Sequence, residues 1–249
     1  ALFSIVVYGA TASRFGIPTA QSHSVIAGLT GAAIALGGAG SVNIHEWVKV
    51  IYGLALSIGL GFVMGWVLCK LVSILFAAAN RRRANVFFKY AQIASAAAMS
   101  FMHGAQDGQK FIGVLILGVA FANGQTGVGD AGIPIWIMLL CSATMGIGTS
   151  VGGERIIKSV GQSMVKLEKY QGFSADLAGA ANLLLATLTG IPVSSTHIKT
   201  CAIMGVGAVK RLSAINFGVV KDMMFTWFFT FPACGLISFV MAKLFMMFI

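Results

Sequence analysis

The sequence predicts an all-α polytopic membrane protein. Of its 249 residues, 57% are hydrophobic and only 10% are charged, and the mean hydropathy is +0.89. Soluble domains carry about a quarter charged residues. Apolar runs such as 47–79 and 223–247 are long enough for a helix to cross a bilayer. The lysines and arginines gather in short clusters between such runs, as expected for cytoplasmic loops.

The charge pattern, the cysteines and the lack of paired catalytic carboxylates exclude several classes of function. The net charge of +10 does not indicate a nucleic-acid partner, because the basic residues separate apolar segments rather than line one surface. The cysteines show no metal or redox spacing, so we expect free thiols and no metal site; they are Cys69, Cys141, Cys201 and Cys234. The sequence holds no HExxH motif and no paired carboxylates, so we do not expect an enzyme.

The first part of the chain divides into apolar segments. In order we expect a partial span over 1–11, an apolar helix over 24–36, an uncharged outer loop over 37–46 and a long helix over 47–79. The chain starts at Ala1 within an apolar run, and we interpret this as the end of a span whose beginning is missing. Arg81–Arg83 follow the long helix and mark the cytoplasmic side.

The second part begins with an apolar run over 91–122 and an outer loop over 123–132. An apolar stretch over 133–150 and a basic inner segment come next. The segment 174–209 starts and ends beside basic clusters, so it must cross twice or form a re-entrant hairpin. A last span covers 223–247. We divide the chain into the remainder of a first repeat (1–80), a basic cytoplasmic linker (81–91) and a second repeat (92–249).

A polar knot interrupts the run 91–122. Within 101–110 it contains His103, Gln106, Asp107, Gln109 and Lys110. Charged side chains at this depth are costly and usually face a protein-lined cavity with a function. Gly104 and Gly108 predict a broken helix here, because freed backbone groups at membrane depth line sites.

Asp107 is the only carboxylate that we place deep in an apolar run, and we expect it to bind a cation or proton. The alternative is a structural pair with Lys110, at helical spacing i+3. Gln106 and Gln109 offer carbonyl oxygens to a cation and amide hydrogens to an anion, or alternatively hydrogen bonds between helices.

One motif occurs twice. Gly16-Ile17-Pro18 matches Gly190-Ile191-Pro192, and each copy is followed by a hydroxyl residue and a histidine, Ser22-His23 and Thr196-His197. Gly31 and Gly205 lie eight residues beyond each histidine. Basic residues end the second copy but not the first, so the copies run in opposite directions, as in inverted-repeat transporters. The alternative is two unrelated helix breaks.

The second copy supplies a hairpin tip with three hydroxyls, those of Ser194, Ser195 and Thr196. We expect this tip to face the same cavity as Asp107; the hydroxyls bind substrate or ion, or alternatively cap the backbone. We expect His23, His103 and His197 to fix hairpin geometry rather than bind metal. The glycine-rich segment 148–153, with Thr149 and Ser150, is similar to a backbone nest for an anion.

These motifs resemble one known family. His103-Gly104-Ala105-Gln106-Asp107-Gly108-Gln109-Lys110 resembles the H-G-A-N-D-x-Q-K signature of the inorganic phosphate transporter family, and 190–197 resembles its G-x-P-V-S-[ST]-T-H hairpin. Segments 148–155 and 170–175 are similar to its linking region, so the resemblance covers 80–249. It implies an inverted-repeat symporter that moves phosphate with Na⁺ or H⁺, with the substrate between two hairpins near the midplane.

The resemblance assigns roles to the candidate residues. We expect substrate binding by Gln109, Lys110, Thr149, Ser150, Ser194, Ser195 and Thr196. We expect the coupling ion at Gln106 and Asp107, and a hairpin or gate role for Ser22, His23, His103 and His197. The expected partners are inorganic phosphate and the lipid bilayer of a bacterial plasma membrane, with no cofactor beyond the coupling ion. A homodimer is compatible with the sequence.

The sequence departs from the family pattern at three places. Gln106 stands where asparagine is usual, and Ala20 in Thr19-Ala20-Gln21-Ser22 cannot supply the usual hydroxyl. The first-half G-A-N-D motif is absent, and we expect it upstream, in an N-terminal part that this chain lacks. Sulfate transport by the same scaffold and a non-transporting membrane scaffold remain the alternatives.

Overall fold

The structure, a computed structural model, describes residues 1–124 and 133–248, and within these ranges all regular structure is helical. The α-helices are α1 (Leu2–Arg14), α2 (Gln21–Gly37), α3 (Ile44–Leu75), α4 (Arg81–Ala122), α5 (Ile135–Gly152), α6 (Glu154–Lys158), α7 (Lys169–Thr189), α8 (Ser195–Ala208) and α9 (Phe217–Phe248). Single short turns of 3₁₀ helix, Ala39–Ser41 and Leu212–Ala214, precede α3 and α9, and a short π-helix, Ser159–Met164, follows α6. The all-α prediction is confirmed. By length and composition, α3 and α9 can each cross a membrane.

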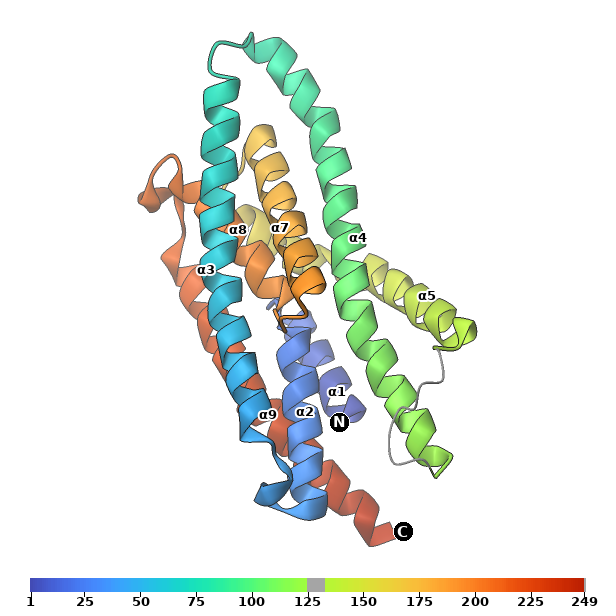
Figure 1. The fold of residues 1–249 in the computed structure, drawn as a ribbon. Coiled ribbons are helices and arrows are strands. Elements are labelled where there is room, and N and C mark those ends of the chain that lie inside the picture. Colours follow the sequence, from blue (N-terminus) through green and yellow to red (C-terminus); the bar gives the residue numbers. More distant parts are fainter. Residues whose placement is uncertain (125–132, 249) are drawn as a thin grey trace.

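Two helical hairpins enter the molecule from opposite ends (Figure 1). One hairpin is α1–α2 and the other is α7–α8, and their tips meet near the middle of the long helices. Hydrogen bonds join the tips: the Thr196 hydroxyl donates to the carbonyl oxygen of Thr19 at 3.1 Å, and the Ser22 hydroxyl to that of Val193 at 3.5 Å. The predicted helix–loop–helix hairpin at 190–197 is confirmed.

α3 and α9 each pack mainly on the hairpin of the other half. α3 lies along α8, and α9 lies along α2. The glycines at the equivalent repeat positions make these approaches close. A Cβ atom built on Gly205 would overlap the carbonyl oxygen of Phe62 in α3, and one on Gly31 would overlap that of Gly235 in α9. These positions therefore require glycine.

The repeat extends beyond the motif visible in the sequence. α3 and α9 have the same length of 32 residues. Both begin after an asparagine whose side chain accepts a backbone N–H: Asn43 from His45 at 3.0 Å and Asn216 from Gly218 at 3.1 Å. Asparagine is a favoured residue at this position of a helix. Equal lengths, matching caps and opposed hairpins confirm the inverted-repeat prediction.

The predicted break at Gly104 and Gly108 is wrong, because α4 runs without interruption from Arg81 to Ala122. Two glycines cost a helix interior only about 2 kcal/mol, which the packing of α4 on α7 outweighs. Residues 81–91, which we assigned to a linker, form the first turns of α4; the repeat boundaries stay a prediction.

The topology prediction places the basic clusters together. The start of α4, with Arg81–Arg83, lies at one end of the molecule and the turn between α2 and α3 at the other, and the loop after α8 lies in the half nearer to Arg81–Arg83 (Figure 1). The predicted outer loop over 123–132 falls largely outside the described residues. Assignment of the arginine end to the cytoplasm stays a prediction.

Candidate functional site

Asp107 lies on the side of α4 that faces the tip of the α7–α8 hairpin, and it is only 1% exposed. One carboxylate oxygen accepts a hydrogen bond from the Lys110 ammonium at 2.8 Å, and the other accepts one from the Ser195 hydroxyl at 2.6 Å. His103 Nδ1 lies 3.5 Å from the second oxygen. His103, Asp107 and Lys110 share one face because they are four and three residues apart on a helix. The predicted proximity of Asp107 to the hairpin tip is confirmed.

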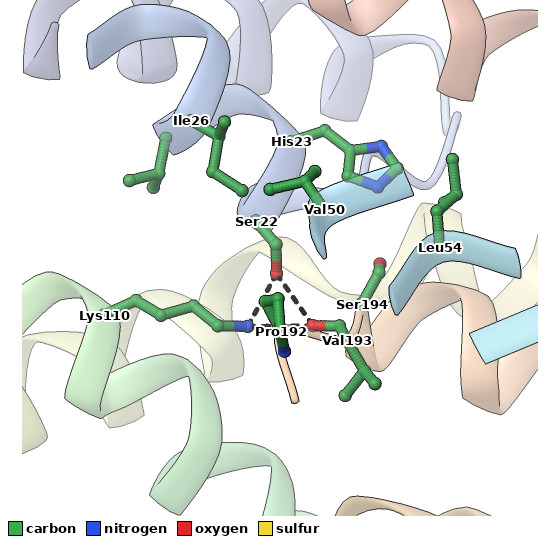
Figure 2. A pocket seen from close by; sticks show the side chains of 10 residues that line it. Ser22, His23, Ile26, Val50, Leu54, Lys110, Pro192, Val193 and Ser194 are labelled. Atoms are coloured by element: carbon green, nitrogen blue, oxygen red, sulfur yellow. Dashed lines mark hydrogen bonds between the residues drawn. The ribbon is translucent and has the colours of Figure 1, made fainter. Parts of the chain in front are cut away.

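Lys110 joins three elements through one ammonium group. Besides Asp107 on α4, it donates to the Ser22 hydroxyl on α2 at 2.6 Å and to the carbonyl oxygen of Val193 in the tip at 3.2 Å (Figure 2). Its three donors are thus matched by a carboxylate, a hydroxyl and a carbonyl. Both hairpins are therefore tied to the centre of α4. The structural pair between Asp107 and Lys110, which we gave as an alternative, is present.

The backbone of the tip explains how its hydroxyls are divided. Gly190 ends α7 with φ 68°, a left-handed conformation that glycine adopts without strain. Ser194 caps α8 by accepting from the N–H of His197 at 3.4 Å, and its own N–H donates to the Ser57 hydroxyl at 3.1 Å. The capping alternative is therefore correct for Ser194. Ser195, the first helical residue, is left to bind Asp107.

A cavity of about 140 Å³ adjoins this cluster (Figure 2). Its wall is largely apolar, and its polar groups are the Lys110 ammonium, the hydroxyls of Ser22 and Ser194 and the His23 ring. This is the pattern of a site that orients a small ligand with few polar groups. The lining residues are Ser22, His23, Val25, Ile26, Val50, Leu54, Lys110, Pro192, Val193 and Ser194.

The remaining predicted residues divide into two groups. Gln106 is buried beside Asp107, and its Oε1 atom has no hydrogen-bond partner among the described residues, so this oxygen is available. Gln109 is exposed. Thr149 and Ser150 are exposed on α5, and their hydroxyls donate to carbonyl oxygens of α5 itself. The segment is helical up to Gly152, so the nest prediction is wrong and these hydroxyls are committed to α5.

His23 and His197 are both buried at the junction of the hairpins, where their rings contact each other with centroids 4.6 Å apart. A hairpin role for both stays a prediction. In the part of the chain that the structure describes, no group of three or more metal-ligating side chains is found.

Sequence reasoning missed a second acidic group. Asp176 lies in α7 with its side chain 16% exposed, and its carboxylate is 3.9 Å from the Lys199 ammonium on α8. Asp107 is therefore not the only acidic residue with a mostly buried carboxylate among the described residues. The signal was present, because Asp176 is a lone acid in an otherwise small and apolar helix. The link from Ser22 to Lys110 was also missed, since 88 residues separate them.

Comparisons with known proteins agree with this architecture. The chain is 39% identical to a probable low-affinity inorganic phosphate transporter of Bacillus subtilis, over 93% of this chain and 69% of that protein. A protein of the same description from Rhizobium meliloti is 37% identical over 96% and 71%. A solved structure described as the sodium-dependent phosphate transporter has the same fold, with a TM-score of 0.90 at 21% identity, covering 100% of this chain and 78% of that one. The model of the phosphate transporter family matches residues 1–238, and the chain belongs to that family.

Proposed function

We propose that the protein is a symporter that moves inorganic phosphate across the membrane together with Na⁺ or H⁺. The observation that carries this proposal is the ion pair between Asp107 and Lys110 at the point where two opposed hairpins meet. A buried charge pair is weak evidence for stability alone. At membrane depth in an inverted repeat, it is the expected position of a substrate and ion site.

The anion side of the proposed site is formed by Lys110 and the start of α8. The ammonium group is a hydrogen-bond donor, and the hydroxyls of Ser195 and Thr196, which here donate to Asp107 and to the Thr19 carbonyl oxygen, can turn to an anion when it binds. The N-terminus of α8 adds the positive end of a helix dipole, which favours phosphate. The cavity beside Lys110 has room for an oxyanion with several of its waters. Gln109 is a further proposed ligand from the exposed side of α4.

The cation side is formed by oxygen atoms. Asp107 contributes a carboxylate, Gln106 a free carbonyl oxygen and Ser195 a hydroxyl, and hard cations prefer such ligands. In this structure the Lys110 ammonium fills the position next to Asp107. A coupling cation that takes this position frees Lys110 for phosphate. Phosphate carries about two negative charges, so entry of cations keeps the net charge of the site low.

The same proposal sets the orientation. The protein crosses a bacterial plasma membrane several times, with the end that holds Arg81–Arg83 in the cytoplasm. A membrane-impermeant thiol reagent tests this in intact cells. An Arg82→Cys variant is expected to react only after the cells are opened, and reaction in intact cells contradicts the orientation.

The transport test uses the full-length protein in proteoliposomes and measures uptake of labelled phosphate. A sodium gradient, a choline gradient and a proton gradient are compared, and excess sulfate is added in a parallel series. We expect uptake to require a cation gradient and to resist sulfate. Equal competition by sulfate indicates a general oxyanion permease, and no uptake under any gradient indicates a non-transporting scaffold.

Two variants connect this activity to the site. Asp107→Asn is expected to abolish uptake while the protein still inserts. Asp222→Asn removes an exposed carboxylate at the start of α9 and is expected to leave uptake unchanged. Normal uptake with normal ion dependence in Asp107→Asn makes Asp107 a structural partner and overturns the assignment.

A further inference from the structure

The two hairpins touch through the same position of each repeat. His23 is the third residue of α2 and His197 is the third residue of α8. Their rings lie with centroids 4.6 Å apart and planes at 61°. A contact between equivalent positions lies on the symmetry axis that relates the two halves. The histidine pair is therefore at the centre of the inverted repeat.

This pair is buried and poorly satisfied. His23 is 3% exposed and His197 0%. Both ring nitrogens of His197 and the Nδ1 atom of His23 have no hydrogen-bond partner among the described residues. Nearly all buried polar groups in native proteins have a partner, so such a cluster requires an explanation. In this arrangement the two rings therefore lack hydrogen bonds that their buried nitrogen atoms could make.

The surroundings of the pair are not symmetric. Both rings pack against α9. The ring centroids of His197 and Trp227 are 3.7 Å apart, and those of His23 and Phe231, which are stacked, are 4.5 Å apart. α3 and α9 begin at Ile44 and Phe217, so Leu54 and Ile58 of α3 occupy the equivalent positions. The α9 side therefore offers two aromatic rings where the α3 side offers two aliphatic side chains.

The cavity shows the same asymmetry. Val50 and Leu54 of α3 form part of its wall (Figure 2). Their equivalents on α9 are Met223 and Trp227, which are buried at 2% and 4% exposure. One half thus has a cavity where the other half is filled. Two halves with the same architecture but different packing are expected to be able to exchange their arrangements.

We propose that His23 and His197 are positioning residues that form the pivot between the hairpins, and that Trp227 and Phe231 hold this pivot on the α9 side. In a second arrangement the two histidine rings pack against Leu54 and Ile58 of α3. The cavity beside α3 then closes, and a cavity opens beside Met223 of α9. The histidine rings pack better on the two aromatic rings of α9 than on aliphatic side chains, so the equilibrium between the two arrangements favours the one described here. This inference goes beyond the transport proposal and does not depend on which anion is carried.

The test gives α9 the same side chains as α3 at the two positions that contact the histidine pair. Trp227→Leu with Phe231→Ile gives α9 the residues of α3. The readout is the rate at which a water-soluble thiol reagent modifies Met223→Cys, in a protein whose half-buried Cys141 is replaced by serine. Loss of two aromatic contacts is expected to raise this rate about tenfold. Phe231→Ile alone is expected to raise it about threefold.

A matched control uses the same helix. Phe225 and Phe229 form a stacked pair at 5.9 Å on the exposed side of α9. Phe225→Leu with Phe229→Ile is expected to leave the rate at Met223→Cys unchanged. Native Cys69 is 0% exposed and reports unfolding, so its reaction must stay slow in every variant. An unchanged rate at Met223→Cys, an equal rise in the control, or a rise only where Cys69 also reacts overturns the proposal.

Discussion

Removal of the Lys110 charge tests whether this ammonium holds the centre of the molecule together. Lys110→Met keeps an unbranched side chain that is one atom shorter but removes the hydrogen bonds to Asp107, Ser22 and Val193. The Asp107 carboxylate, 1% exposed, then loses its nearest positive charge. Breaking a buried pair in this way costs about 3–5 kcal/mol. The Lys110 side chain is a quarter exposed, so we expect the lower end, about 3 kcal/mol.

In a protein of this size, that loss corresponds to a fall in Tm of about 6–12 °C. It is measured as thermal unfolding of the purified protein in detergent. The double variant Lys110→Met with Asp107→Asn contains no unpaired charge, and the asparagine can still accept from Ser195. We expect it to recover most of the lost stability but no uptake, which gives a large coupling energy in a double-mutant cycle. A Tm for Lys110→Met within about 2 °C of the parent protein refutes this reasoning.

Four other changes have definite expected results. Gly205→Val is expected to cost about 3 kcal/mol of stability, measured by thermal unfolding, because its side chain would overlap α3. Gly104→Ala is expected to gain about 0.5–1 kcal/mol, since nothing lies near the added Cβ atom. Thr149→Ala is expected to leave phosphate uptake unchanged, because this hydroxyl bonds within α5. The hydrogen bond that the Lys210 ammonium donates to the Glu168 carboxylate raises the pKa of Lys210. The pair therefore stabilises the folded protein at neutral pH, and this contribution begins to fall as the pH rises above about 10.5. Unfolding of Lys210→Gln followed from pH 7 to 11 should therefore show a deficit below about 1 kcal/mol that shrinks at the alkaline end.

The hairpin arrangement could be predicted from the sequence because its signals are local. The repeated Gly-Ile-Pro segments, with basic residues after one copy only, indicate two helix breaks with opposite orientation. The meeting of Ser195 and Asp107 follows from the hairpin tip and the polar knot lying at the same depth. These features depend on periodicity and charge, which a sequence displays directly.

Other features depend on competition between local and tertiary terms. The glycines at 104 and 108 predict a break from local propensity, but a long helix packed along α7 outweighs that penalty. Which hydroxyl of the tip binds Asp107 depends on the residue at which α8 begins, because Ser194 is used as the cap. The contacts of Lys110 with Ser22 and of Asp176 with Lys199 require the relative placement of separate helices, which no local pattern contains.

α3 and α9 each cover the hairpin of the other half, and this has a consequence for the order of folding. α2 is covered mainly by α9, the last helix of the described chain, and α8 is covered by α3, which is made much earlier. During synthesis α3 is therefore already present when the α7–α8 hairpin is made. The α1–α2 hairpin, in contrast, lacks its packing partner until α9 has been made. A chain stopped after α8 leaves Gly31 and the surface around it facing lipid instead of Gly235. The α1–α2 hairpin is thus covered only after α9 has been made.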